Sequence, residues 1–224
     1  MYENLKGKTI SFEGGEGAGK STVLKMLIEY LQNQGVDCTA TREPGGNKIS
    51  EQIRDVIVSD NNTNISPETE ALLFAASRAQ FISETIKPLL KTDKTIFIDR
   101  FVDSSYVYQG FVRNLGIDRI KQINEFATGG FMPNLTIFFD VPPEIGFERI
   151  KKNNRSTNRL DNEGLEFHKK VYRGYKMLAS NYPQRIKTVD ATKPPEEVLA
   201  QILEYLLFVW KIMGLLYGEP IFYF

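Results

Sequence analysis

The stretch that most constrains the fold is TISFEGGEGAGKST, residues 9–22, in which a glycine-rich turn separates an apolar run from an amphipathic one. The spacing G-x-x-x-x-G-K-[ST] of a phosphate-binding loop runs from Gly14 to Ser21. Such a loop requires a strand before it and a helix after it, because its backbone N–H groups point at phosphate oxygens from a helix N-terminus. The apolar residues of 9–12 and the helical spacing of 23–31 meet both requirements.

We expect this loop to bind the phosphates of a nucleoside triphosphate. Lys20 would reach the β- and γ-phosphates, and the Ser21 hydroxyl would hold Mg²⁺. A glycine-rich turn without a ligand is the alternative, but spacing, Lys-Ser pair and flanking pattern all favour the phosphate loop. The predicted ATP-binding residues are Gly14, Gly15, Glu16, Gly17, Ala18, Gly19, Lys20, Ser21 and Thr22.

Short apolar runs alternate with helical patterns along the whole chain. The predicted strands cover residues 9–12, 36–41, 95–99, 135–141 and 186–189. The predicted helices cover residues 21–34, 50–59, 67–91, 103–109, 117–127, 143–153, 165–181 and 195–213. Strands separated by crossover helices pair in parallel, so the pattern predicts an α/β fold: a P-loop NTPase-type parallel sheet of about five strands with helices on both faces. Ligands of such sheets bind beyond the carboxyl ends of the strands.

Composition bounds the domain organisation and the partners. A chain of 224 residues, 42% of them hydrophobic, fills one core, so we expect a single domain over 1–224. The 28 basic and 28 acidic residues balance, which argues against nucleic acid as a partner. The single cysteine, Cys38, fits the reducing cytoplasm, and the N-terminus has no signal-peptide pattern.

The last residues, 211–224, form an unusually apolar tail. Lys211 and Gly214 interrupt the apolar run and Pro220 ends any helix, so it falls short of the roughly 20 apolar residues of a membrane span. We expect a helix packed on the core or on a second subunit rather than a membrane anchor. The role of the tail itself stays open.

Two segments suggest contacts to an anion and a base. Arg42 ends the second predicted strand beside Glu43, and is either half of a surface ion pair or a guanidinium for an anionic ligand. Phe74 and Arg78 lie four residues apart on one helix face, where a ring could stack on a nucleobase and a guanidinium could reach its edge. Taken alone, that pair fits better as a core phenylalanine and a solvated arginine.

The third predicted strand ends at Asp99 and Arg100. The acid could organise Mg²⁺ or accept a proton, and the arginine could hold a second phosphate. Ser105, Tyr108 and Gln109 follow at helical spacing and share one face. Because an amide both donates and accepts, and because aromatic and amide groups share this face, ligand contact is favoured over a face turned to water.

The polar segment from about 149 to 161 carries Arg149, Arg155 and Arg159 among few apolar residues. It is either a solvated loop or a small mobile lid that closes over phosphates. Residues 16–18 of the phosphate loop carry no basic side chain, so the charge that phosphoryl transfer needs would come from the lid. An arginine in that place is worth roughly 10³–10⁵ in rate in related chemistry. Arg155 is the first choice.

Five motifs, FEGGEGAGKST, TREPGG, LLFAASR, DRFVDSSYVYQG and NRLD, occur in the order found in bacterial thymidylate kinases with lid arginines. The resemblance runs from about residue 8 to about 191. It implies an enzyme that moves the ATP γ-phosphoryl group to dTMP with Mg²⁺, and that is usually a cytoplasmic homodimer. The helix face near Ile120, Ile123 and Phe126 could help to form the dimer.

The resemblance also implies roles for individual residues. Thymine would be contacted by Phe74, Arg78, Ser105 and Gln109, the sugar by Glu16 and Tyr108, and the acceptor phosphate by Arg42, Arg54 and Arg100. Phe101 departs from the family, which commonly has Tyr or His after the Asp-Arg pair. His168, the one histidine, lies beside two lysines on a predicted helix and is expected at the surface.

The predicted reaction is direct in-line transfer. A phosphate monoester is largely ionised at neutral pH, with a second pKa of about 6, so a strong general base is unnecessary. Lys20, Mg²⁺ on Ser21 and Asp99, Arg100 and a lid arginine would neutralise charge. The alternatives are a kinase of another nucleoside monophosphate, a deoxynucleoside kinase with Asp99 as base, and a non-catalytic ATP-binding switch.

Overall fold

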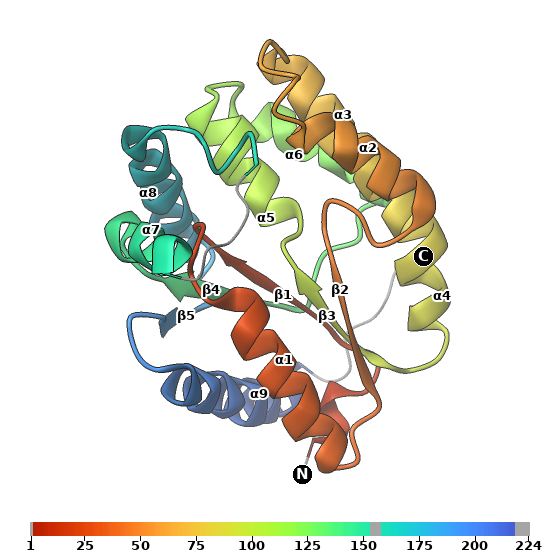
Figure 1. The fold of residues 1–224 in the computed structure, drawn as a ribbon. Helices are drawn as coiled ribbons and strands as arrows, with labels where there is room; N and C mark the ends of the chain where they lie inside the picture. The colour runs from red at the N-terminus through yellow and green to blue at the C-terminus, as the bar shows by residue number, and fades with distance from the viewer. Residues whose placement is uncertain (1, 153–157, 218–224) are drawn as a thin grey trace.

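The computed structural model describes residues 2–152 and 158–217, with side chains as far as Leu207. Its centre is a sheet of five parallel strands in the order β2-β3-β1-β4-β5 (Figure 1). The strands are β1 (Thr9–Gly14), β2 (Cys38–Arg42), β3 (Thr95–Asp99), β4 (Leu135–Asp140) and β5 (Ile186–Asp190). The predicted five-stranded parallel α/β fold is therefore confirmed.

Helices connect the strands as crossovers. The α-helices are α1 (Lys20–Asn33), α2 (Lys48–Val58), α3 (Pro67–Phe81), α4 (Lys87–Leu90), α5 (Val102–Ser105), α6 (Ile117–Thr128), α7 (Pro143–Lys152), α8 (Leu165–Asn181) and α9 (Pro195–Tyr217). A short 3₁₀ helix, η1 (Glu3–Leu5), precedes β1, and two π-helical segments are η2 (Ile82–Ile86) and η3 (Tyr106–Val112). The predicted helix 67–91 is thus α3, η2 and α4 in succession, and the predicted helix 103–109 is π-helical from Tyr106.

Local sequence chemistry starts several of these helices. The Ser66 side chain accepts a hydrogen bond from the Thr69 backbone N–H, and Pro67 occupies the first turn of α3. The Asn47 side chain caps α2 in the same way, accepting from the Ser50 N–H at 3.0 Å. These caps satisfy backbone donors that a helix N-terminus leaves without partners.

Each face of the sheet carries its own apolar core, because successive side chains of a strand point to opposite faces. On β3, Phe97 packs with α1 and α9 on one face, whereas Ile96 and Ile98 pack with α3, α6 and α8 on the other. Figure 1 shows α1 and α9 together on one side of the sheet. Helices on both faces match the prediction.

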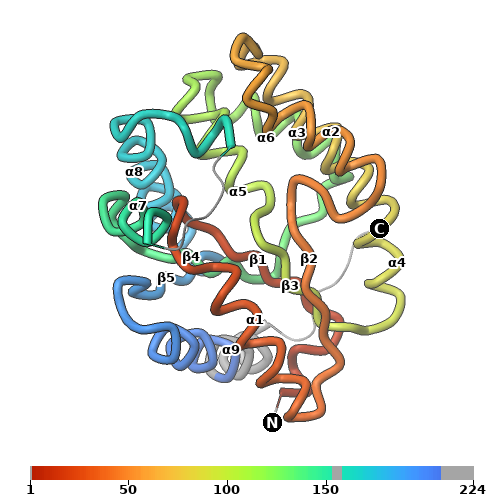
Figure 2. Tube along the Cα trace, viewed as in Figure 1, coloured from red at the N-terminus to blue at the C-terminus, as the bar shows by residue number. Residues whose placement is uncertain are grey.

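Helix α7 rests directly on the turn between β1 and α1. A Cβ on Gly17 would lie 2.1 Å from the Gly146 carbonyl oxygen, and a Cβ on Gly146 would lie 2.3 Å from that of Glu16. Only glycines allow two backbones to approach this closely. Figure 2 shows that the chain leaves β1 and β4 at the same edge of the sheet, which brings α7 against this turn.

Two surface expectations were wrong. His168 is 4% exposed, with its ring edge-on against Phe147 and Phe167, because α8 turns this position towards α7. Burial lowers the pKa of His168. Ile120 is 1% exposed and belongs to the core, whereas Phe126 on the same helix is 93% exposed.

The C-terminal helix is longer than expected and continues to Tyr217. Residues 218–224 of the apolar tail lie outside the described residues. In the part of the chain that the structure describes, no helix is both long and apolar enough to cross a membrane.

Candidate active site

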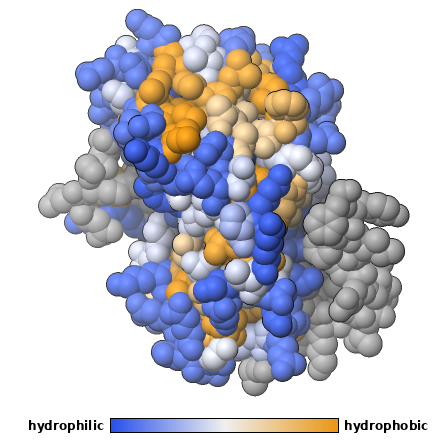
Figure 3. All heavy atoms as spheres, turned by 90° about the vertical axis from the view of Figure 1, so that its right-hand side faces the viewer, coloured by the Kyte–Doolittle hydropathy of each residue, from blue (hydrophilic) through white to orange (hydrophobic). Residues whose placement is uncertain are grey.

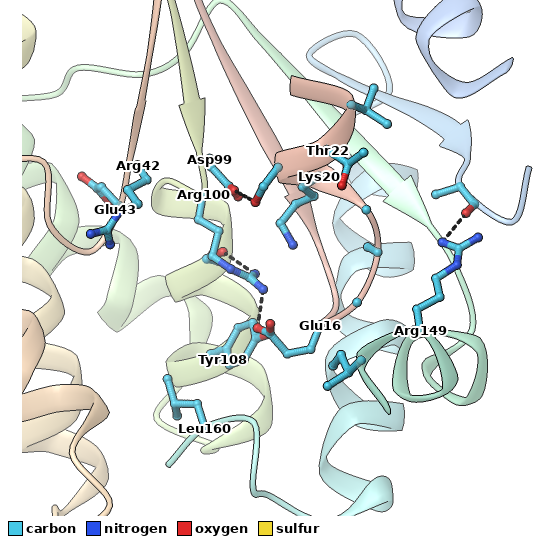
Figure 4. Close-up of a pocket in the computed structure, with 18 of the residues that line it drawn as sticks. Glu16, Lys20, Thr22, Arg42, Glu43, Asp99, Arg100, Tyr108, Arg149 and Leu160 are labelled. Atoms are coloured by element: carbon cyan, nitrogen blue, oxygen red, sulfur yellow. Dashed lines mark hydrogen bonds and ion pairs between the residues drawn. The ribbon is translucent and has the colours of Figure 1, made fainter. Parts of the chain in front are cut away.

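A cavity of about 860 Å³ lies beyond the carboxyl ends of β1, β2, β3 and β5, as expected for a parallel sheet. Figure 4 shows Arg42 and Glu43 at one end, Lys20 and Asp99 in the middle, and Arg149 at the other end. The predicted site residues that line it are Glu16, Gly17, Ala18, Gly19, Lys20, Ser21, Thr22, Arg42, Arg54, Phe74, Asp99, Arg100, Ser105, Tyr108, Gln109 and Arg149. One cavity therefore joins most of the predicted positions.

The turn from β1 to α1 has the geometry of a phosphate loop. Gly17 and Gly19 adopt φ of 68° and 86°, a left-handed conformation that favours glycine. The buried Lys20 Nζ donates to the carbonyl oxygens of Gly14, at 3.3 Å, and Gly15, at 3.1 Å. Burial, and then the charge of Arg100, lower the pKa of Lys20. The ammonium is thus held inside the loop, where phosphate oxygens would meet it.

Ser21 and Asp99 form a pair in the middle of the cavity (Figure 4). The Ser21 hydroxyl donates to the Asp99 carboxylate at 2.7 Å. A hydroxyl and a carboxylate side by side fit Mg²⁺, which takes oxygen ligands and keeps several waters and substrate phosphates in its shell. Among the described residues, no group of three or more His, Cys, Asp or Glu side chains could hold a metal without such help.

Arg100 is fixed in a strained conformation that aims its guanidinium along the loop. Its φ is 69°, and its backbone N–H donates to the Phe12 carbonyl oxygen at 3.0 Å. The guanidinium donates to the Gly14 carbonyl oxygen at 2.8 Å and forms an ion pair with Glu16. A left-handed backbone at a non-glycine residue costs of order 1–3 kcal/mol and is typical of functional sites.

The end of the cavity that the resemblance assigns to the acceptor phosphate, the acceptor end, is cationic. Arg54 donates to the Pro44 carbonyl oxygen at 3.2 Å, and Arg42 donates to the same oxygen at 3.3 Å and pairs with Glu51. Burial, and then the charge of Arg42, lower the pKa of Arg54. Crowded guanidinium groups of this kind suit an anionic ligand.

The end of the cavity that the resemblance assigns to the base, the base end, is built from α3 and η3. Phe74, Ser105, Tyr108 and Gln109 all line the cavity. In η3 the Arg113 N–H reaches the Tyr108 carbonyl oxygen, a π-helical step at 2.9 Å. The face predicted on α-helical spacing therefore exists, although most of it lies in a π-helix.

Arg78 does not line the cavity and is 2% exposed. It lies behind Ser105, to whose hydroxyl it donates at 3.0 Å, and its Nε pairs with Glu43 at 2.7 Å. Its other acceptors are Asn124 Oδ1 and the Phe101 carbonyl oxygen. The solvated arginine of the alternative interpretation is thus wrong, because the guanidinium is enclosed by acceptors.

The side chain of Phe101 is also buried, and its ring lies 5.3 Å from the Arg78 guanidinium carbon. Its edge-on neighbour is Phe131. The departure from the family pattern therefore falls on a core position rather than on the cavity lining. Only the backbone of Phe101 makes hydrogen bonds, to Glu13 and Arg78.

The two arginines of the predicted lid that the structure describes, Arg149 and Arg159, have different partners. Arg149 donates to the carbonyl oxygens of Ala191, at 2.8 Å, and Thr192, at 3.2 Å, in the loop after β5. Arg159 does not line the cavity; it pairs with Glu70 at 2.7 Å and donates to the Ile57 carbonyl oxygen. Arg155 lies outside the described residues.

Sequence reasoning missed part of the lining. The loop after β5 contributes Ala191, Thr192, Lys193, Pro194 and Pro195, and the C-terminal part of the predicted lid segment contributes Asn158 and Leu160. The predicted parallel order contained a signal for the first group, because every strand that ends at this edge carries its following loop to the ligand. Gly14 and Gly15 do not line the main cavity, since their carbonyl oxygens face Lys20 instead.

Comparisons with known proteins agree with this geometry. A family model described as thymidylate kinase matches residues 12–202. The thymidylate kinase of Clostridium novyi (strain NT) is 49% identical over 202 residues, covering 90% of this chain and 98% of the relative. The thymidylate kinase of Geobacillus sp. (strain WCH70) is 51% identical over 200 residues, covering 89% of this chain and 95% of the relative.

A solved structure is similar as well. The crystal structure of thymidylate kinase from Ehrlichia chaffeensis has a TM-score of 0.72 and 27% sequence identity, and the match covers 90% of this chain and 98% of that one. Sequence and fold thus point the same way over nearly the full length. This chain belongs to the thymidylate kinase family.

Proposed function

We propose that this chain is a dTMP kinase that transfers the γ-phosphoryl group of ATP to dTMP, giving dTDP and ADP. Family membership supports the activity. The observation that carries it is that a phosphate loop and a cluster of three arginines, Arg42, Arg54 and Arg100, line one cavity with Asp99 between them. Two phosphorylated ligands can therefore meet end to end.

Charge neutralisation and positioning do the catalytic work in this proposal. Lys20 holds the β- and γ-phosphates from inside the loop, and Arg100, tied to Gly14 and Glu16, spans the gap towards the acceptor. Transferred phosphoryl groups concentrate negative charge on their oxygens, which such fixed cations stabilise. The acceptor phosphate is already ionised, so no residue has to remove a proton.

Ser21 and Asp99 are the residues that would hold Mg²⁺, directly or through water. When bound, the ion would neutralise the β- and γ-phosphates of ATP. The same pair leaves Asp99 engaged with a hydroxyl donor, which fits an orienting role better than that of a general base.

We assign the far end of the cavity to the ATP base and sugar. Arg149 and the loop after β5 lie on the opposite side of the phosphate loop from Arg42 and Glu43 (Figure 4). Arg149 therefore acts on donor binding, and Arg155 remains the first choice for a lid arginine that reaches the transferred phosphoryl group.

We further propose a homodimer formed by α2, α3 and α6. Figure 3 shows apolar side chains gathered over the upper part of the face where α2 and α3 lie. Large exposed apolar side chains come from all three helices, namely Val56, Leu72 and Phe126. A patch of this kind is typical of an interface. The single buried cysteine, Cys38, supports the cytoplasm as the location.

The test is ADP release by the purified chain with ATP and Mg²⁺ across a panel of nucleoside monophosphates and thymidine. We expect rapid turnover with dTMP, slower turnover with dUMP, and negligible turnover with AMP, GMP, CMP and thymidine. Turnover of thymidine would make Asp99 a general base and the chain a nucleoside kinase. ATP binding without any transfer would leave a nucleotide-binding switch and overturn the proposed reaction.

A further inference from the structure

Glu70 of α3 is a buried carboxylate at the centre of a network behind the base end of the cavity. Its side chain is 2% exposed. One carboxylate oxygen accepts from Gln109 Nε2 at 2.9 Å, and the other accepts from Arg159 at 2.7 Å. Arg113 donates to both oxygens, at 3.4 and 3.3 Å, and also pairs with Glu163.

Two guanidinium groups keep this carboxylate ionised. Burial alone would raise the pKa of Glu70, but the hydrogen bond from Gln109 and the charge of Arg113 bring it below its ordinary value. An ionised carboxylate has acceptors only. Gln109 must therefore turn its NH₂ group towards Glu70 and its carbonyl oxygen away from the carboxylate, which leaves that oxygen as an acceptor for a ligand in the cavity.

The neighbouring Ser105 contacts a buried donor, whereas Gln109 contacts a buried acceptor. Arg78 has donors only, and it donates to the Ser105 hydroxyl at 3.0 Å. The hydroxyl proton of Ser105 therefore points away from Arg78, and Ser105 lines the cavity. A buried anion behind Gln109 and a buried cation behind Ser105 thus leave an acceptor beside a donor.

We propose that Glu70 is a positioning residue for base specificity: by fixing the Gln109 amide, it makes the cavity select a pyrimidine whose edge offers a carbonyl oxygen beside an N–H. Thymine and uracil have that edge, through O4 and N3–H. Cytosine has the reverse, an NH₂ group beside an unprotonated N3, and that N3 would face the Gln109 carbonyl oxygen, an acceptor against an acceptor. This inference rests on the proposed dTMP kinase function and deepens it at the acceptor base.

A substrate that leaves buried polar groups of the site without hydrogen-bond partners is strongly disfavoured against one that pairs them. Glu70→Gln keeps the shape of the side chain but can donate as well as accept, so the Gln109 amide becomes free to reverse. We expect the ratio of kcat/KM for dTMP to that for dCMP to fall by about tenfold or more. The ratio for dTMP to dUMP stays unchanged, because those two bases share the same edge.

Glu163→Gln is the matched control, since Glu163 also pairs with Arg113 but has no described contact with Gln109. We expect it to leave both ratios and the KM for ATP unchanged. Gln109→Met is the second variant and should lower the dTMP-to-dCMP ratio by itself. Added to Gln109→Met, the Glu70→Gln substitution should then have no further effect on the ratio, because its effect acts through the amide.

Binding of dTMP, dUMP and dCMP is measured by calorimetry alongside turnover. A wild-type chain that binds dTMP over dCMP without turnover would overturn the proposed reaction and leave the base-selection inference standing. The inference is overturned if Glu70→Gln folds and keeps the dTMP-to-dCMP ratio. It is also overturned if Gln109→Met keeps the dTMP-to-dCMP ratio. The same holds if either variant lowers kcat/KM for dTMP, dCMP and dUMP by the same factor.

Discussion

The position of the Arg149 guanidinium is fixed by two backbone carbonyl oxygens, those of Ala191 and Thr192, to which it donates. The guanidinium is held at the end of the cavity that we assign to ATP, away from Arg42 (Figure 4). On that assignment, Arg149 contributes to the binding of ATP more than to the stabilisation of the transferred phosphoryl group. Hydrogen bonds from charged groups are worth about 1.5–3 kcal/mol.

We therefore predict that Arg149→Ala raises the KM for ATP by about tenfold, equivalent to ~1.4 kcal/mol, with little change in kcat. Steady-state kinetics with saturating dTMP measures both constants. The control is Lys152→Ala, an exposed position on the same helix. A loss of kcat at unchanged KM would instead place Arg149 on the transferred phosphoryl group.

Glu13 makes stability depend on pH. It is fully buried behind the phosphate loop and accepts from the Phe101 N–H, the Ser104 hydroxyl and Tyr175. Burial, and then the charge of Asp103, raise the pKa of Glu13 to about 7, whereas an unfolded glutamate titrates at about 4.3. The folded state therefore binds this proton more tightly than the unfolded state.

The stability from that proton is complete below about pH 4.3 and is lost as the pH rises through about 7. We predict that the free energy of unfolding of the wild type falls more steeply than that of Glu13→Gln over this window. Urea denaturation at a series of pH values measures the two slopes. Equal slopes of the free energy of unfolding against pH for the wild type and Glu13→Gln would show that the pKa of Glu13 is the same in the folded and unfolded states.

At the scale of elements, α7 and the phosphate loop behave as one unit because Gly146 and Gly17 touch through their backbones. A Cβ at position 146 would lie 2.3 Å from the Glu16 carbonyl oxygen, which is backbone and cannot swing away. Helix α7 ends at Lys152 and so includes the first residues, 149–152, of the predicted lid. We therefore expect a displacement of α7 to disturb both the loop and the predicted lid.

We predict that Gly146→Ala costs about 1–3 kcal/mol of stability, as overpacking does, and raises the KM for ATP. Thermal unfolding and steady-state kinetics measure the two effects. Gly164→Ala is the control, because nothing lies within 4 Å of a Cβ there and its φ is −67°. Equal thermal unfolding and equal KM for ATP in the two variants would mean that the backbones at Gly146 and Glu16 move apart at no cost in free energy.

At the scale of the whole molecule, the exposed apolar side chains of α3 and α6 belong to the dimer interface that we propose. Phe126 is 93% exposed and Leu72 is 58% exposed. Placing a carboxylate in an apolar interface leaves a charge without water, at a cost of several kcal/mol. Association through these helices should therefore be sensitive to a single acidic substitution.

We predict that the wild type sediments as a dimer and that Phe126→Glu sediments as a monomer with unchanged thermal unfolding of the protomer. Analytical ultracentrifugation over a concentration series distinguishes the two. Leu165→Glu, at an exposed leucine on α8, is the control and should remain a dimer. A monomeric wild type would contradict the proposed interface.

Much of the fold followed from local pattern. Ile96, Phe97 and Ile98 are successive apolar residues, as expected for a strand that is covered on both faces. The glycine spacing after β1 is compatible with few backbone conformations other than a phosphate loop. The π-helical segments did not follow, because apolar spacing does not distinguish the i+4 from the i+5 hydrogen bond. Tyr108 and Gln109 nevertheless both line the cavity, and their contact with a ligand stays a prediction.

The sequence by itself determined the phosphate loop, the parallel sheet, the edge at which ligands bind and the family. These depend on neighbours a few residues apart. Only the tertiary structure decided that Arg78 stands behind Ser105, that Arg159 pairs with Glu70, and that Arg149 donates to the loop after β5. An arginine looks the same in sequence whether it meets a phosphate or a buried carboxylate, because its partner comes from a distant element that packing alone brings near.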